Sequence, residues 1–243
     1  MYKEFLETDQ RPYPIPERQW IMTQVWRDLL FLHWPVPTDQ LRPYIPAPLE
    51  LDEYKGSAWI SIIPMKITNV RIRGLPLIPF MNSYLELNVR TYVTCQGKPG
   101  IYFFSLDANH PLAVLGAKLS TGLPYKQARM SYEKKGRTIR FYSRRLSNHA
   151  GLDVEYRPDT LLYEAARGTL DFWLLERYCL YTFRGGHLYR GDIHHDQWKI
   201  TKAEVQLRHS TMDPFLHLDL YGDLIIHYSS RRRLFLYPLE KLT

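Results

Sequence analysis

The sequence predicts a mainly β fold, in the form of a single curved-sheet or β-barrel domain with a few short helices. Many short strand-like segments are separated by turn residues, and few segments have a helical pattern. The chain also contains 18 Tyr, 10 Phe and 6 Trp among its 243 residues, and aromatic side chains favour strands. We find no linker, repeat or low-complexity tract, so residues 1–243 are expected to form one domain.

Proline dominates the expectations for the first third of the chain. Eleven of the 17 prolines lie before residue 80, and proline interrupts both helices and central strands. We therefore expect loops, short helices and short or edge strands here. Thr38–Leu41 is predicted to form a short capped helix that ends before Pro43. Residues 57–70 are rich in β-formers and predict a strand with a bulge or bend at Pro64.

The clearest strand pattern covers residues 84–94, where apolar and polar side chains alternate. Residues 96–100 form a predicted turn, and residues 101–106 return as the second strand of a hairpin.

Helices are expected at two later places. Asn109 can cap a helix that has Pro111 in its first turn and stops at Gly122. Residues 170–181 form a second helix-like segment. The remaining predicted strands are residues 127–133, 138–146, 199–209 and 216–229, with a Lys-Lys-Gly-Arg turn between the first two.

The formal net charge of +7 and the pI near 9.3 raise the question of nucleic-acid binding. The basic side chains are scattered, however. Their local groups at residues 134–137, 144–145 and 231–233 belong to no nucleic-acid-binding motif. We therefore expect no nucleic-acid partner.

The sequence gives no sign of membrane insertion or export. No uncharged apolar run approaches the roughly 18 residues that span a bilayer. Glu4, Glu7 and Asp9 occupy the stretch where a signal peptide would be apolar. Cys95 and Cys179 are too few for a disulfide scaffold. We expect a cytoplasmic protein with free thiols and no membrane contact.

One face of the predicted strand at residues 84–94 carries the first candidate site. Glu86, Asn88 and Arg90 share this face. Polar residues on one face usually mark the solvent side of a sheet, and Glu86 and Arg90 could also neutralise each other as a structural pair. In a closed sheet the same face would line a cavity, where a carboxylate and a guanidinium can bind or protonate a small acid.

Lys126 lies at a predicted junction between a helix and a strand, where many pockets are found. A lysine that is desolvated, or placed beside another cation, loses part of its proton affinity and can attack a carbonyl group. Most lysines are instead exposed and solvated, so the sequence leaves both alternatives open.

His194 and His195, flanked by Asp192 and Asp196, have the side chains of a metal-ligand set. Adjacent residues on a strand point to opposite faces, so only one of the histidines could serve a given site. The sequence also lacks a Gly-x-Ser-x-Gly motif, a phosphate-binding loop and a dinucleotide fingerprint. We expect neither a metal nor a cofactor.

Several segments resemble the YqjF-like family of unknown function, in order and over almost the whole chain. They are ELNVRTYV (86–93), GIYFFSLDA (100–108), GLPYKQARM (122–130), ERYCLY (176–181), HHDQW (194–198), HYS (227–229) and LLFLHWPVP (29–37). That family is similar, more remotely, to acetoacetate decarboxylase. The resemblance implies a cone-shaped, β-barrel-like domain with few helices. Related barrels tend to assemble, so the chain could form a homo-oligomer.

Acetoacetate decarboxylase works through a lysine Schiff base, and the pKa of that lysine is lowered by a neighbouring lysine. The first lysine of its Gly-Phe-Pro-Lys-Lys motif is the nucleophile. In this sequence Tyr125 falls at the nucleophile position, Lys126 at the position of the partner, and Glu86 at the catalytic-site glutamate. A phenol cannot form an imine, so the resemblance does not imply acetoacetate decarboxylation here. The candidates for the N-terminal site arginine of the decarboxylase are Arg27 and Arg42.

We therefore expect a cavity that binds or transforms a small carbonyl or carboxylate compound without a Schiff base. Tyr125 would act as an acid or hydrogen-bond donor, with Glu86 and Lys126 as further catalytic candidates. The expected ligand-binding residues are Arg90, Arg129, Tyr102 and Phe104. Two alternatives stay open: a Schiff-base enzyme of the decarboxylase or aldolase type that uses Lys126, and a non-catalytic ligand sensor or binding module. For an enzyme we expect lyase-like chemistry on a small keto acid or a related carbonyl compound.

Overall fold

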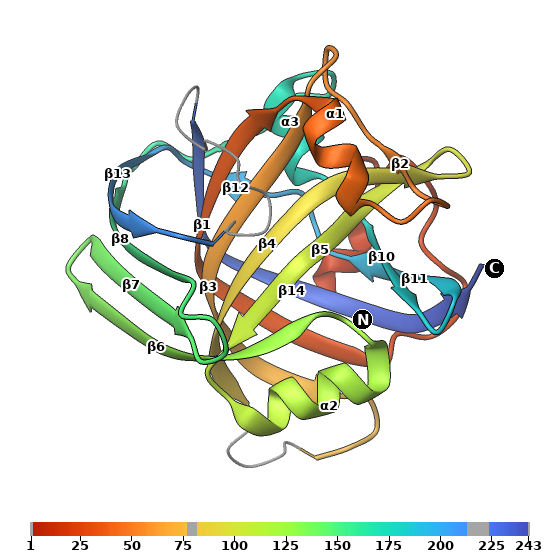
Figure 1. Ribbon diagram of the computed structural model, residues 1–243, viewed down its shortest axis with the longest axis horizontal. Helices are drawn as coiled ribbons and strands as arrows, with labels where there is room; N and C mark the ends of the chain where they lie inside the picture. Colours follow the sequence, from red (N-terminus) through yellow and green to blue (C-terminus); the bar gives the residue numbers. More distant parts are fainter. Residues whose placement is uncertain (1, 77–81, 213–223, 243) are drawn as a thin grey trace.

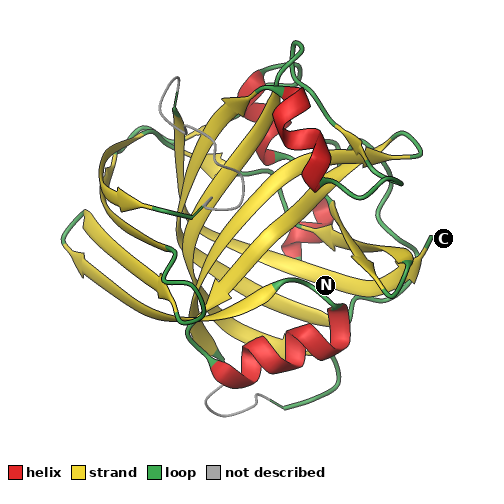
Figure 2. Ribbon diagram, in the orientation of Figure 1, coloured by secondary structure: helices red, strands yellow, loops and turns green. Residues whose placement is uncertain are grey.

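The computed structural model describes residues 2–76, 82–212 and 224–242. Among these residues, seven strands close a barrel in the order β4, β5, β10, β11, β14, β1 and β3, and β3 pairs back to β4 (Figures 1 and 2). The barrel strands are β1 (Met22–Val36), β3 (Ala58–Ile72), β4 (Ser83–Cys95), β5 (Lys98–Ala108), β10 (Cys179–Arg184), β11 (His187–His194) and β14 (Ile225–Lys241). The predicted mainly β, barrel-like fold is confirmed.

A second group of strands, here called the arm sheet, continues from β5 and covers the outside of the barrel (left in Figure 1). Its strands are β6 (Tyr125–Lys135), β7 (Thr138–Arg145), β8 (Gly151–Pro158) and β13 (Ala203–Ser210). Its first strand pairs with β5 in parallel, and β7, β8 and β13 follow in that order, each antiparallel to its neighbour.

Short elements close the ends of the barrel. Helix α2 (Pro111–Thr121) crosses the lower end in Figure 1, and α1 and α3 lie at the upper end. The other short elements are η1 (Lys3–Leu6), α1 (Thr38–Leu41), η2 (Arg42–Tyr44), β2 (Glu50–Leu51), β9 (Tyr163–Glu164), α3 (Leu170–Leu175) and β12 (Lys199–Ile200). None of the helices in the described ranges is both long and apolar enough to cross a membrane.

Strand β4 is buried on both faces because it separates two interiors. Leu85, Leu87 and Val89 point outward, where they pack with apolar side chains of the arm sheet such as Phe141 and Val154. The alternate residues point into the barrel. The predicted alternation of this strand is therefore correct, but its polar face meets an enclosed space rather than solvent.

The expectation of only short or edge strands in the first third was wrong. Strands β1 and β3 each have 15 residues, and both are paired on two sides. Pro64 is tolerated because the pairing with β1 is interrupted between Arg27 and Leu32, where Asp28 forms a bulge with φ of 50°. The bulge is thus on the partner strand, opposite Pro64. Pro35 lies beyond His33, the last residue of β1 that pairs with β14.

The helix predictions need three corrections. The N-cap of α2 is His110, whose ring accepts a hydrogen bond from the backbone of Ala113, whereas Asn109 accepts one from the backbone of Leu85. The predicted stop at Gly122, with φ of 69°, is correct. Helix α1 has Pro37 at its N-cap position and no side-chain cap.

The third correction concerns the segment at residues 170–181. Only Leu170–Leu175 is helical, because Cys179 and the residues after it pair with β11 and β5 as β10. Long-range pairing overrides the local helical pattern here.

Both predicted hairpins are present. The turn between β4 and β5 is tighter than predicted, with Gln96 and Gly97 at φ of 52° and 72°, as in a two-residue primed turn. Strands β8 and β11 were not predicted. Of the predicted strand at residues 216–229, residues 216–223 lie outside the described residues, and the remainder begins β14.

Candidate functional site

The barrel encloses a cavity of about 390 Å³. This volume is within the range of small-molecule sites. Its walls are mostly apolar, and residues of α2 contribute to one end. The polar side chains that line it are Gln24, Tyr84, Glu86, Asn88, Arg90, Ser120, Thr121, Tyr125, Arg177 and His195. This pattern of apolar walls with a few polar groups is typical of a ligand-binding pocket.

A buried carboxyl group lies at one side of the cavity. Glu86 on β4 accepts a hydrogen bond of 3.0 Å from the hydroxyl group of Tyr125 at the start of β6. Burial, with the neighbouring Glu86 carboxyl and Tyr84 phenol groups, raises the pKa of Tyr125 well above its usual value. Burial raises the pKa of Glu86 to about 7, and the hydrogen bonds from Tyr125 and Asn88 oppose this rise. Glu86 is therefore a group that can exchange a proton near neutral pH.

Arg90, four residues further along β4, provides the opposite charge. Its side chain is buried, its Nε atom has no hydrogen-bond partner, and it forms no ion pair among the described residues. Burial lowers its pKa from the usual value, but a guanidinium remains charged in a protein. Four strand positions separate Arg90 from Glu86 by roughly 13 Å. The two groups therefore do not neutralise each other.

A second guanidinium, that of Arg177, lies near Arg90 and also lines the cavity. Arg177 follows α3, pairs with Asp52 and donates to the backbone oxygen of Trp173. Its Nη2 atom is buried without a partner. Of these two buried cations only Arg177 has a carboxylate partner, Asp52, which makes this side of the cavity favourable for an anion.

His195 and Trp198 complete the polar part of the lining. The Nδ1 atom of His195 lies 2.8 Å from the backbone oxygen of Asp196, and burial lowers the pKa of His195 to about 3. The imidazole is therefore neutral at physiological pH. The indole nitrogen of Trp198 is buried without a partner, so it can donate a hydrogen bond to a ligand.

The structure brings together Tyr125, Glu86 and Arg90 from the predicted site, but not Lys126 and Arg129. Both of these side chains are exposed and neither lines the cavity. Because consecutive strand residues point to opposite sides, an inward Tyr125 requires an outward Lys126.

Tyr102 and Phe104, predicted to bind the ligand, do not line the cavity either. Ile101 and Phe103 do so instead. Phe104 sits at a bulge in β5. On the partner strand β4, Val89 pairs with Ser105 and the next residue, Arg90, pairs with Phe103, so Phe104 is the extra residue of the bulge. The bulge reverses the alternation of side chains, so the next inward residue is Leu106.

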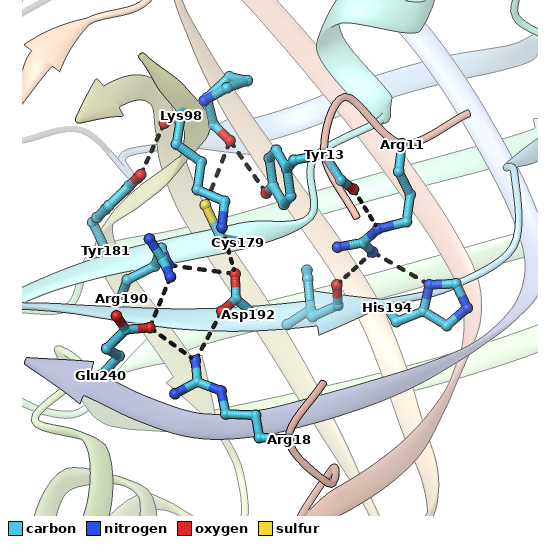
Figure 3. Close-up of polar contacts among 12 residues, drawn as sticks. Arg11, Tyr13, Arg18, Lys98, Cys179, Tyr181, Arg190, Asp192, His194 and Glu240 are labelled. Atoms are coloured by element: carbon cyan, nitrogen blue, oxygen red, sulfur yellow. Dashed lines mark hydrogen bonds and ion pairs between the residues drawn. The ribbon is translucent and has the colours of Figure 1, made fainter. Parts of the chain in front are cut away.

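Figure 3 shows the surroundings of His194, one of the two histidines with the side chain of a metal ligand. Arg11 donates to Nδ1 of His194 over 3.2 Å, and Nε2 lies 2.7 Å from the backbone oxygen of Glu4. Both ring nitrogens are therefore occupied by the N-terminal segment. Within the described residues, no group of three or more His, Cys, Asp or Glu is placed to hold a metal ion.

The same view shows how the N-terminal segment is attached to the barrel (Figure 3). The carboxylate of Asp192 accepts from Arg18 at 2.8 Å and lies 3.5 Å from the Lys98 ammonium group. Arg11 also donates to the backbone oxygen of Ile193. The segment thus fixes the end of β11, which carries His195 into the cavity.

Two arginines predicted as counterparts of a site arginine lie elsewhere. Arg27 donates to Thr68, Arg42 donates to the backbone of Leu49, and neither lines the cavity. Arg177 was not predicted. The available signal was a charged Glu-Arg pair between two apolar segments, which is unusual unless the charges have a specific partner.

Comparison with solved structures identifies the class of fold. The enduracididine biosynthesis enzyme MppR, complexed with pyruvate, matches with a TM-score of 0.65 and 10% identity, covering 93% of this chain and 92% of that one. Acetoacetate decarboxylase from Legionella pneumophila matches with a TM-score of 0.64 and 13% identity, covering 96% and 92%. An acetoacetate decarboxylase-like enzyme from Sphingomonas wittichii RW1 matches with a TM-score of 0.63 and 10% identity, covering 96% and 99%. The fold is acetoacetate decarboxylase-like.

The family follows from sequence similarity. The chain belongs to the DUF2071 family, described as an uncharacterized conserved protein, whose profile matches residues 23–232. It is also 45% identical over 234 residues to the uncharacterized protein YqjF of Bacillus subtilis (strain 168), covering 96% of this chain and 97% of that protein. The predicted resemblance to YqjF-like proteins is confirmed.

Proposed function

We propose that the barrel cavity binds a small organic carboxylate that carries a second polar group, such as a keto acid. The observation that carries this proposal is the Arg90 guanidinium, which is buried in the cavity wall without a carboxylate partner. An unpaired buried charge is costly, and an incoming carboxylate would remove that cost through charge-assisted hydrogen bonds. Arg177 lies close enough to Arg90 to strengthen the attraction.

The second polar group of the ligand would lie near Tyr125 and Glu86. Since Glu86 titrates near neutrality, it can donate a proton to a carbonyl oxygen or accept one from a hydroxyl group. Apolar side chains such as Ile101, Phe103 and Leu180 line the space between the two polar ends. A structural neighbour is described as complexed with pyruvate, a keto acid, which agrees with this ligand class.

The same geometry disfavours a Schiff base at Lys126, because this side chain is exposed and outside the cavity. We expect borohydride treatment with a panel of keto acids to leave the intact mass of the protein unchanged. A stable adduct that maps to Lys126 would restore the Schiff-base alternative.

Binding can be tested with pairs of compounds that differ only in charge. We expect pyruvate, acetoacetate or longer 2-oxo and 3-oxo acids to raise the melting temperature of the protein, whereas the matching methyl esters do not. In calorimetric titrations, Arg90→Gln should raise the Kd of the acids at least about tenfold. The matched control Arg129→Gln alters an exposed arginine outside the cavity and should leave the Kd unchanged.

Two results would contradict the proposal. One is equal binding of acids and esters, and the other is the absence of stabilisation by every acid in the panel. Tyr125→Phe and Glu86→Gln should also weaken the ligand-induced stabilisation, because both remove polar contacts at the carbonyl end. New NMR signals during incubation with a bound acid would identify an enzyme, whereas binding without turnover would identify a ligand-binding protein.

A further inference from the structure

Beside Arg90, further polar side chains extend across the inner face of the barrel strands, because Ser61 lies opposite Arg90 and His33 lies opposite Ser61. They come from five elements of the fold, namely β4, β3, β1, β14 and α3. We call this group the polar chain, and its members are Arg90, Tyr92, Ser61, His33, His227 and Asp171. All except Asp171 are almost fully buried, while the side chain of Asp171 is 34% exposed.

The half of the polar chain next to the cavity is continuous. The guanidinium carbon of Arg90 lies 5.8 Å from the centre of the Tyr92 ring, and the Tyr92 hydroxyl group acts on the guanidinium and opposes the effect of burial on its pKa. The Tyr92 and Ser61 hydroxyl oxygens are 2.6 Å apart, and Ser61 Oγ lies 2.7 Å from Nδ1 of His33. A guanidinium can only donate. All donors are satisfied if Arg90 donates to Tyr92, and if Nδ1 of His33 accepts from Ser61, its nearer partner, rather than from the Tyr92 hydroxyl group at 3.2 Å. Tyr92 then donates to Ser61.

The other half begins at the surface. Nε2 of His227 lies 3.1 Å from Oδ1 of Asp171. Tyr163 donates to the second oxygen of Asp171 over 3.2 Å. The positive charge of Lys202 also stabilises this carboxylate. Because a carboxylate accepts, Nε2 of His227 carries a hydrogen, and Nδ1 of a neutral ring is then an acceptor.

The two halves meet at a pair of imidazole rings. His33 and His227 lie on the neighbouring strands β1 and β14, their ring centroids are 5.4 Å apart, and the rings are inclined by 64°. Nε2 of His33 and Nδ1 of His227 are both buried without a partner. The assignments above make the first atom a donor and the second an acceptor. These complementary atoms can be linked through one water molecule.

We propose that the polar chain acts as one unit that positions the Arg90 guanidinium and links the cavity to Asp171 at the protein surface. The inference rests on the proposed function where it concerns ligand binding, since Arg90 is the proposed carboxylate site. In this arrangement Asp171 is the distant counterion of Arg90. A change at Arg90 alters the polarisation of each hydrogen bond in turn as far as Asp171. By thermodynamic linkage, a change at Asp171 must also affect Arg90.

Burial and neighbouring charges keep the inner imidazole neutral, as the polar chain requires. The pKa of His33 is held well below its usual value by burial, and the positive charge of Arg90 acts in the same direction. The hydrogen bond from His227 lowers the pKa of Asp171, which therefore remains a carboxylate. Both conditions fit a chain that runs from the Arg90 cation through a neutral His33 to the Asp171 anion.

The hydrogen-bond assignment can be tested on the free protein by NMR of the imidazole nitrogens. We expect His33 and His227 both to carry the hydrogen on Nε2 at neutral pH. Arg90→Gln should shift the Nδ1 ¹⁵N resonance of His227, and this response should be lost in the Tyr92→Phe background. As a matched control, Tyr181→Phe removes a hydroxyl group that donates to the backbone of Lys98 outside the polar chain, so the response should persist.

Two findings would overturn the inference, namely a hydrogen on Nδ1 of His33, or an equal response of His227 to Arg90→Gln with and without the Tyr92 hydroxyl. Neither measurement requires a ligand. If the responses are as expected but no carboxylate binds, the polar chain stands and the proposed function fails. If pyruvate or a longer keto acid binds, Tyr92→Phe should raise its Kd about tenfold, whereas Tyr181→Phe should not.

Discussion

The hydroxyl group of Tyr125 donates a hydrogen bond of 3.0 Å to Oε2 of Glu86. Pairing of β4 with β5, and of β5 with β6, places Asn88 opposite Leu106 and Leu106 beside Tyr125, so the two side chains reach the same part of the cavity. The bond opposes the effect of burial, which raises the pKa of Glu86 to about 7. Together, these two effects set the proton affinity at the carbonyl end of the proposed site.

The raised pKa of Glu86 predicts that the stability of the folded protein depends on pH. In the unfolded chain this group has a pKa near 4.5, so between that pH and about 7 the folded state binds more protons than the unfolded state. The free energy of unfolding therefore falls as pH rises through this window. Glu86 should account for a decrease of roughly 3 kcal/mol in the free energy of unfolding across this window. Urea denaturation at pH 4.5 and pH 8 should show this loss for the wild type relative to Glu86→Gln.

The exposed residue Glu53 provides the control for this comparison. Glu53→Gln should keep the pH dependence of the wild type. The depressed pKa values of His194 and His195, about 4 and 3, act in the opposite direction because these rings bind protons only when the chain unfolds. The difference between variants, rather than the wild-type curve alone, isolates Glu86. A parallel pH profile of Glu86→Gln and wild type would contradict the prediction.

Asp28 is expected to fasten the arm sheet to the barrel. Its carboxylate accepts from Tyr132 at 2.7 Å, Lys134 at 2.7 Å and Tyr228 at 2.6 Å. Asn can adopt the positive φ of this bulge but cannot accept from three donors as a carboxylate does. Asp28→Asn should lower the free energy of unfolding by about 2 kcal/mol in urea denaturation.

The same carboxylate should give an acid-sensitive contribution. Burial raises the pKa of Asp28, but the hydrogen bonds from Lys134, Tyr228 and Tyr132 outweigh it, so the pKa lies below the usual value of 3.8. The stabilisation is present above that value and is lost as pH falls through the lower folded-state pKa. Asp9→Asn, at an exposed position, should change neither the free energy of unfolding nor its dependence on pH. Equal stability of both variants would refute the role of Asp28.

Gly100 is expected to be intolerant of a side chain. An added Cβ would lie 2.7 Å from the Cys179 sulfur, 2.7 Å from a Tyr181 ring carbon and 2.9 Å from the Cys179 backbone oxygen. The backbone oxygen cannot move aside without disturbing the β5–β10 pairing. Gly100→Ala should lower the free energy of unfolding by about 1–3 kcal/mol.

Gly116 in α2 provides the matched control, because an added Cβ there would meet nothing within 4 Å. Gly116→Ala should raise the free energy of unfolding by about 0.5–1 kcal/mol. Similar melting temperatures of the two variants would contradict this prediction.

A buried ion pair provides a second attachment of the arm sheet. Arg145 on β7 donates to Asp107 on β5 at 2.9 Å and to Ser105 at 2.8 Å. Arg145→Met leaves the buried Asp107 carboxylate without this partner and should cost roughly 3–5 kcal/mol. The double variant Arg145→Met/Asp107→Leu should regain most of the loss in urea denaturation. No recovery would mean that the pair also fixes the backbone.

Periodicity predicted the wall of the cavity where a strand is regular. On β4 it placed Glu86, Asn88 and Arg90 on one face, and the structure turns that face inward. It could not decide between solvent and cavity, because closure of the barrel depends on the pairing of β5 with β10, strands about 80 residues apart in the chain.

Irregular backbone explains what the sequence did not reveal. The bulge at Phe104 exchanged the faces of β5, so the aromatic residue at the cavity is Phe103 rather than Tyr102 or Phe104. The bulge at Asp28 allowed Pro64 to sit in a central strand. Bulges depend on contacts between strands, and no local pattern in a single sequence identifies them.

Strand β4 faces two interiors, and this makes its register essential. Deleting or inserting one residue before Leu85 would exchange the two sides of the strand beyond that point. The leucine and valine side chains would then enter the cavity, and Glu86 and Arg90 would be pressed against the aliphatic layer beneath the arm sheet. Homologues with the same pocket should therefore align along this strand without gaps, whereas length changes can collect in the β6–β7 turn.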